Sequence, residues 1–155
     1  MRADEIMSTP VLTCHAQETL NIAAHKMWEA DCGAIAIIND DGRLVGMVTD
    51  RDICMAGLMQ NQPLSEIPIH IAMARQVYAV QPLQPVEDVE RLMALHQLRR
   101  IPVVGADGKP VGLISINDLT REMAKPQSQL RGGLIRLVQT LGLICQPRAE
   151  AKRAA

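Results

Sequence analysis

Aromatic residues are almost absent from this sequence, which has one Trp, one Tyr and no Phe among its 155 residues. Hydrophobic residues nevertheless make up 48% of the chain, and nine of them are methionines. A core can therefore form from aliphatic and methionine side chains. Any bound base would pack against aliphatic side chains, Tyr78 or an arginine, because the chain lacks the rings for an aromatic sandwich.

Features of exported, membrane-spanning or nucleic-acid-binding proteins are also missing. The first residues, Met1–Glu5, are charged rather than apolar, and no apolar run approaches the length of a membrane span. The four cysteines show no CxxC spacing, and the formal net charge is −1. We expect a cytoplasmic protein with reduced cysteines, no nucleic-acid partner and no membrane insertion.

Metal and catalytic motifs are equally scarce. Cys14 and His15 are adjacent, but no second pair has the spacing of a metal site. No Ser-His-Asp or Cys-His arrangement is readable, and the carboxylates are not paired for acid–base chemistry. We therefore expect no metal site, no required cofactor and no enzymatic activity.

The sequence does contain an internal repeat. Residues 6–53 and 72–119 align without insertion or deletion. Such a repeat is the first clue to the fold. The positions identical in both copies are Met7/Met73, Val11/Val77, Met27/Met93, Ile35/Ile101, Asp41/Asp107, Gly42/Gly108, Val45/Val111, Gly46/Gly112 and Asp52/Asp118.

Each copy has the pattern β-α-β-β-α. Apolar residues at helical spacing (Leu20, Ala23, Met27) predict the first helix, and an Asp-Gly pair between two apolar runs predicts a hairpin. The expected elements of the first copy are 11–14, 17–30, 34–38, 44–48 and 50–59; those of the second are 77–80, 84–97, 101–104, 110–114 and 116–124.

One copy buries too little surface to be comfortably stable alone, whereas two copies can bury their sheets against each other. We therefore predict an α/β (α+β) fold with approximate two-fold symmetry and two equivalent clefts between the halves. The expected division is repeat 1 at 1–60, a connector at 61–71 containing Pro63 and Pro68, and repeat 2 at 72–125.

The last strand of each copy ends in the same motif: glycine, two apolar residues, a hydroxyl residue, two variable residues and aspartate. It spans Gly46–Asp52 and Gly112–Asp118. One interpretation is helix capping by Thr49 and Ser115, with the aspartate in the first turn. The other is a ligand site, since a helix N-terminus attracts phosphate and a carboxylate can accept from ribose hydroxyls. The residues alone leave both open.

The repeat with its Gly-h-h-Thr/Ser-x-x-Asp motif resembles the CBS-domain family, named after cystathionine β-synthase. The resemblance covers residues 6–124, and it includes the spellings Thr-Asp-Arg-Asp-Ile at 49–53 and Arg-Arg-Ile-Pro-Val at 99–103. It implies a tandem CBS pair, or Bateman module, with pseudo-two-fold symmetry.

The resemblance also implies a function. Such pairs act as regulatory modules that bind AMP, ADP, ATP or S-adenosylmethionine in the clefts and signal to a protein partner by conformational change, usually as homodimers. The alternative is a structural or dimerisation module without a physiological ligand.

The same resemblance assigns roles to residues of the clefts. Asp52 and Asp118 would bond the ribose. Because Gly33 and Ala34 replace the two arginines of the second copy, we expect unequal clefts, and the cleft reached by Arg99 and Arg100 should bind phosphate better, unless both arginines are simply solvated. The phosphate residues would be Thr49, Ser115, Arg99 and Arg100, and the base would contact Ile35, Ala36, Ile101, Pro102 and Val103.

A final amphipathic helix is expected at 126–145, followed by a disordered tail at 146–155. It could pack on its own domain, join a second copy or another protein, or lie on a membrane surface. Arg131, Arg136 and Gln139 would lie opposite its apolar stripe of Leu130, Leu134, Leu137, Val138, Leu141 and Ile144.

Overall fold

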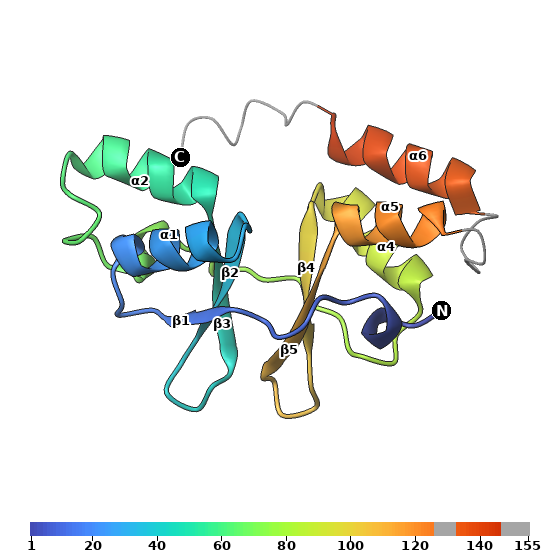
Figure 1. The fold of residues 1–155 in the computed structure, drawn as a ribbon, viewed down its shortest axis with the longest axis horizontal. Helices are drawn as coiled ribbons and strands as arrows, with labels where there is room; N and C mark the ends of the chain where they lie inside the picture. The colour runs from blue at the N-terminus through green and yellow to red at the C-terminus, as the bar shows by residue number, and fades with distance from the viewer. Residues whose placement is uncertain (126–132, 147–155) are drawn as a thin grey trace.

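The computed structural model describes residues 1–125 and 133–146, and in it each copy of the repeat forms a small sheet flanked by helices (Figure 1). This arrangement confirms the predicted α/β fold. The first half contains β1 (Thr13–His15), α1 (Leu20–Glu29), β2 (Ala34–Ile38), β3 (Leu44–Thr49) and α2 (Asp50–Gln60). The second contains α4 (Val86–His96), β4 (Arg100–Val104), β5 (Pro110–Ser115) and α5 (Ile116–Ala124).

The two predicted hairpins are present. β2 pairs antiparallel with β3, and β4 pairs antiparallel with β5. Gly42 and Gly108 in the turns have φ values of 76° and 78°, a region that favours glycine. The Asp-Gly pairs therefore form the tight turns that the sequence indicates.

The first strand exists in only one half. β1 runs parallel to β2, and Ala36 N donates to Leu12 O over 3.2 Å. The equivalent of Ala36 is Pro102, which has no N–H to donate. The predicted strand at 77–80 is therefore wrong: it is reduced to an isolated parallel bridge between Val80 and Val103.

The segments at the start of each copy cross to the opposite half. We call residues 3–8 and 69–74 the leading segments; they contain η1 (Ala3–Glu5) and α3 (Ile69–Ala72). Ser8 bridges Leu113 of β5, and Ala74 bridges Met47 of β3. Each half therefore includes backbone contributed by the other repeat, and α3 is a short helix that the sequence did not predict within the connector.

The hydrophobic cores show the same exchange. One cluster of buried side chains belongs to the first half and includes Ile67 and Ile69 from the connector. The other belongs to the second half and includes Ala3 and Ile6 from the N-terminus. Each core therefore includes side chains that stand, in the sequence, at or just before the start of the other repeat.

Each leading segment also places a methionine over a glycine. Met7 covers Gly112 and Met73 covers Gly46, so two of the nine identical pairs form two equivalent contacts. A Cβ at Gly112 would lie 2.7 Å from Met7 Cγ and 3.0 Å from Met7 Cβ. Glycine is required here because the methionine of the crossing segment fills the space of a side chain.

The C-terminal helix α6 (Leu134–Ile144) packs on α4 of the second half. Leu137 and Ile144 are buried in the second core, and Arg136 donates to the buried Glu90. The helix thus packs on its own domain, the first of the three interpretations. Two details of the expected stripe are wrong, because Val138 is 60% exposed and Arg136 faces α4. Residues 126–132 of the expected helix and 147–155 of the expected disordered tail lie outside the described residues.

Replacing Gly112 with alanine should destabilise the protein by about 1–3 kcal/mol, because the new methyl group overlaps Met7. Urea unfolding measures this difference. Gly142→Ala is the control: it lies in α6, and a Cβ added there would have nothing within 4 Å, so alanine should leave stability equal or slightly higher. Equal stability of Gly112→Ala and the wild type would contradict the tight crossing.

Replacing Arg136 with methionine should loosen α6, because it leaves the Glu90 carboxylate buried beside α6 without its cation. We expect a loss of about 2 kcal/mol at neutral pH, since solvent reaches the partly exposed Arg136. Burial raises the pKa of Glu90, and the hydrogen bond and charge of Arg136 offset this only in part.

The cost of Arg136→Met should therefore shrink as the pH falls through the raised folded pKa of Glu90, because the protonated acid needs no cation. Chemical unfolding at several pH values measures it. Arg91→Met removes an exposed pair with Asp88 and should cost at most about 1 kcal/mol. A pH-independent cost at Arg136 would argue against this role of Glu90.

Candidate functional site

The two Gly-h-h-Thr/Ser-x-x-Asp motifs form matching helix starts. Thr49 is the N-cap of α2 and Ser115 is the N-cap of α5, both in extended conformation. Each hydroxyl accepts from the backbone N–H of the aspartate three residues on, and each aspartate accepts from the backbone N–H of its cap residue. The capping interpretation of the motif is confirmed, and the carboxylates are thereby held at fixed positions beside the helix ends.

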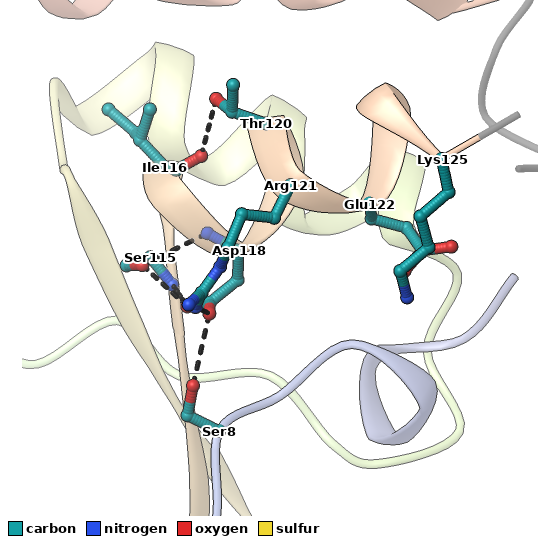
Figure 2. A network of polar contacts seen from close by, with 8 residues as sticks. All are labelled: Ser8, Ser115, Ile116, Asp118, Thr120, Arg121, Glu122 and Lys125. Atoms are coloured by element: carbon teal, nitrogen blue, oxygen red, sulfur yellow. Dashed lines mark hydrogen bonds and ion pairs between the residues drawn. The ribbon is translucent and has the colours of Figure 1, made fainter.

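Asp118 stands at the centre of a larger polar network (Figure 2). Its Oδ2 accepts from Ser115 N over 2.7 Å and from Ser115 Oγ over 2.5 Å. Its Oδ1 accepts from Ser8 Oγ over 3.1 Å and from the guanidinium of Arg121. Burial alone would raise the pKa of Asp118, but the hydrogen bonds from Ser115, Arg121 and Ser8 outweigh it and hold the pKa below its usual range.

Asp52 has a simpler environment. Its Oδ2 accepts from Thr49 N over 2.9 Å and from Thr49 Oγ1 over 2.6 Å. The repeat places Ala74 where the second site has Ser8, and Met55 where it has Arg121. Neither side chain can donate to a carboxylate, so the two aspartates share the cap but differ in their remaining partners.

A cavity of about 810 Å³ lies beside Asp118. The second half contributes Leu113, Ser115, Asn117, Asp118, Thr120 and Arg121, together with Arg100. The first repeat contributes Ala30–Ala34, Pro10–Leu12 and, from its crossing segment, Ser8. The cavity therefore lies between the repeats. There the Gly112–Asp118 motif of the second copy faces residues 30–34, the segment that leads into β2 of the first copy.

Three of the residues predicted for ligand binding line this cavity: Ser115, Asp118 and Arg100. The sequence did not point to Ser8, which the crossing of the leading segment brings there, or to Ala30–Ala34, which lie across the cavity from the second copy. For Arg121, on the closing helix, the sequence alone left two interpretations, a phosphate contact or a solvated helix face. Its place in the cavity follows from its ion pair with Asp118.

The other predicted residues are placed differently. Thr49, Asp52 and Arg99 line neither this cavity nor the second one described below, and Arg99 is exposed. The candidate base residues lie on β2 and β4 with buried side chains, and they also line neither cavity. Their roles remain predictions. These residues are Ile35, Ala36, Ile101, Pro102 and Val103.

A second cavity of about 590 Å³ lies on the helical side of the first half. Its lining includes Trp28 on α1 and Cys54 on α2. It shares Asp31–Gly33 and Arg100 with the larger cavity, so the lead-in to β2 separates the two spaces. The side chain of Arg100 comes within 3.0 Å of the position that a Cβ on Gly33 would occupy. Gly33 is the residue of the first copy that aligns with Arg99 of the second.

Comparison with known proteins agrees with this architecture. The CBS domain model matches residues 3–58 and 64–125, which correspond to the two halves of the structure. The chain belongs to the CBS-domain family. The first match includes η1 and the second includes α3, so each matched CBS domain contains its own leading segment.

Two relatives of this CBS pair are similar in sequence. Uncharacterized protein YlbB of Bacillus subtilis is 38% identical over 117 residues, which cover 75% of this chain and 78% of that protein. Hypoxic response protein 1 of Mycobacterium tuberculosis is 32% identical over 149 residues, which cover 96% of this chain and 97% of that protein.

Solved CBS structures have the same fold. The CBS domain pair of protein MJ0100, in complex with 5′-methylthioadenosine and S-adenosyl-L-methionine, superimposes with a TM-score of 0.71 at 28% identity, covering 86% of this chain and 97% of that one. Hypoxic Response Protein I with two coordinated zinc ions also gives 0.71, at 34% identity, covering 78% and 98%.

Two negative observations apply to the ranges 1–125 and 133–146 of this CBS pair. No helix there is long and apolar enough to cross a membrane. No group of three or more His, Cys, Asp or Glu side chains there is arranged to hold a metal ion.

The network around Asp118 predicts acid sensitivity. A lowered folded pKa contributes stability above the usual aspartate pKa of about 3.9, and this contribution is lost as the pH falls through the folded value. Asp118→Asn should lack this contribution, so the difference in unfolding free energy between wild type and variant should shrink as the pH falls below about 4. Chemical unfolding over this range measures it; a constant difference would contradict the network.

Proposed function

We propose that this CBS pair is a ligand-sensing regulatory module that binds an adenosine-type ligand in the cavity beside Asp118. The candidates are AMP, ADP, ATP and S-adenosylmethionine. The observation that carries the proposal is the cavity itself: it lies between the repeats, has the size of a small-molecule site and contains Ser115 and Asp118 at the start of a helix.

The chemistry of the lining supports this ligand class. A carboxylate held beside a cavity is a suitable acceptor for the two hydroxyls of a ribose. The start of α5, with Ser115 and the positive charges of Arg100 and Arg121, suits phosphate groups. The family relationship supports the adenosine part, because the CBS pair of MJ0100 is described in complex with two adenosine-containing molecules.

The second cleft is proposed to use Thr49 and Asp52 with Arg99, as the repeat implies. The helix start there has the same geometry, but its surroundings differ at Ala74 and Met55. We therefore propose that the two clefts bind ligand with different affinities, and that the cleft beside Asp118 has its own ligand preference.

Signalling is proposed to follow from the origin of the lining residues. Ala30–Ala34 come from the first half, whereas Ser115, Asp118 and Arg121 come from the second, so a bound ligand contacts both. A ligand that binds one relative placement of the halves better will shift the population toward it. A non-catalytic module of this kind, in the cytoplasm, would act through a protein partner.

Self-association is part of the proposal. Apolar side chains are exposed on α2 at Leu58 and Met59, and on α6 at Ile135 and Val138. Figure 1 shows both helices along the same edge of the molecule. We propose that this edge takes part in a homodimer, since exposed apolar clusters on helices commonly mark contact surfaces.

A structural module without a ligand is the alternative. It is favoured by the capping boxes, because Thr49, Asp52, Ser115 and Asp118 already have hydrogen-bond partners. The two functions differ in what the aspartates do. In a structural module, replacing them changes stability only.

Calorimetric titration with AMP, ATP and S-adenosylmethionine tests the proposal. Asp118→Ala should weaken binding about 10- to 100-fold, the loss expected when a charged hydrogen-bond acceptor is removed. Asp40→Ala removes an exposed carboxylate of the first hairpin turn and is the control, with unchanged affinity expected. Absence of binding by the wild-type protein would favour the structural alternative.

A further inference from the structure

The carboxylate of Asp118 has no acceptor capacity left. A carboxylate offers about four lone-pair positions, two on each oxygen. Ser115 N and Ser115 Oγ donate to Oδ2, and Ser8 Oγ and Arg121 donate to Oδ1 (Figure 2). A ribose hydroxyl that binds here must therefore displace one of the present donors.

The four donors differ in how easily they can leave. The two from Ser115 belong to the N-cap of α5, so their loss would expose the helix start. The backbone of Ser8 is fixed by hydrogen bonds to Leu113, with N–O distances of 2.8 Å and 3.2 Å, so its short side chain stays near the carboxylate even when the hydroxyl rotates. Arg121 reaches Asp118 only through the end of a long side chain, and that side chain is 72% exposed. Arg121 is the donor that a ligand can move.

Moving Arg121 has a consequence for the ligand. Its guanidinium remains charged and remains beside the cavity, next to the position of the incoming ligand. A ligand with a phosphate offers the guanidinium a new anionic partner. A ligand with the same ribose but no negative charge removes the old partner without replacing it.

We infer that Arg121 is a specificity-determining residue: it closes Asp118 to neutral nucleosides and admits phosphorylated ones. This inference rests on the proposed function and deepens it, because it names the class of adenosine ligand that the cavity selects. It applies to one cleft. Asp52, on the same motif of the other copy, has Met55 at the position of Arg121 and Ala74 at the position of Ser8.

The repeat itself supplies the test variant, Arg121→Met, which gives the second site the side chain of the first. Titration with adenosine and with AMP isolates the phosphate, because the two ligands share the ribose and the base. In Arg121→Met, adenosine should bind about 3- to 10-fold more tightly and AMP about 3- to 10-fold more weakly. The AMP/adenosine preference should therefore fall by at least about tenfold.

Two further variants define the result. Arg43→Met removes an exposed arginine of the first hairpin turn and should leave the preference unchanged. Arg121→Lys keeps the charge and should retain most of the preference, whereas a structural role for the guanidinium fork would not be restored by lysine. Circular dichroism verifies that each variant is folded.

The outcomes separate this inference from the proposed function. If the wild-type protein binds AMP and Arg121→Met changes both ligands in the same direction, or neither, the role of Arg121 is wrong and the ligand site stands. If the wild-type protein binds neither adenosine nor AMP, the proposed function is wrong and the role of Arg121 is wrong with it.

Discussion

Both the stability and the candidate site of this CBS pair require the leading segments to cross between the halves. Ser8 pairs with Leu113 and Ala74 with Met47, so the last strand of each half is bordered by backbone from the other repeat. Ala3 and Ile69 enter the two cores in the same exchanged way. Each repeat is too small to bury a sufficient core alone, and the exchange lets the two halves complete each other.

The candidate site is a product of this crossing. Without it, Ser8 would not reach the motif of the second copy, and Asp118 would have only its cap residue and Arg121 as partners. The same crossing explains why methionine and glycine recur at equivalent positions of both copies, since the side chain of one fills the space beside the other. Both the fold and the candidate site therefore depend on the crossing of the leading segments.

Departures from the internal symmetry give the two halves different properties. Pro102 lacks the N–H that Ala36 donates, so the second half has a bridge where the first has a strand. α6 packs on α4 through Arg136 and Glu90, whereas the equivalent region of the first half contains an open cavity lined by Trp28. Arg121 and Ser8 surround one aspartate only. A pair built from two copies can thus carry two unequal sites.

The repeat, the order of the elements, the Asp-Gly hairpins and the capping motif were all predictable from the sequence, because they depend on local spacing, turn chemistry and hydrogen bonds within a few residues. Ser115, Asp118 and Arg100 were named through the family resemblance, and the structure places all three at the cavity, while their roles in binding stay predictions. The shared cavity of Ser8, Ala30–Ala34 and Arg121, and the inward direction of Arg136, emerged only from the folded chain. Those contacts join segments up to 110 residues apart, and no local pattern encodes which distant residue will lie opposite.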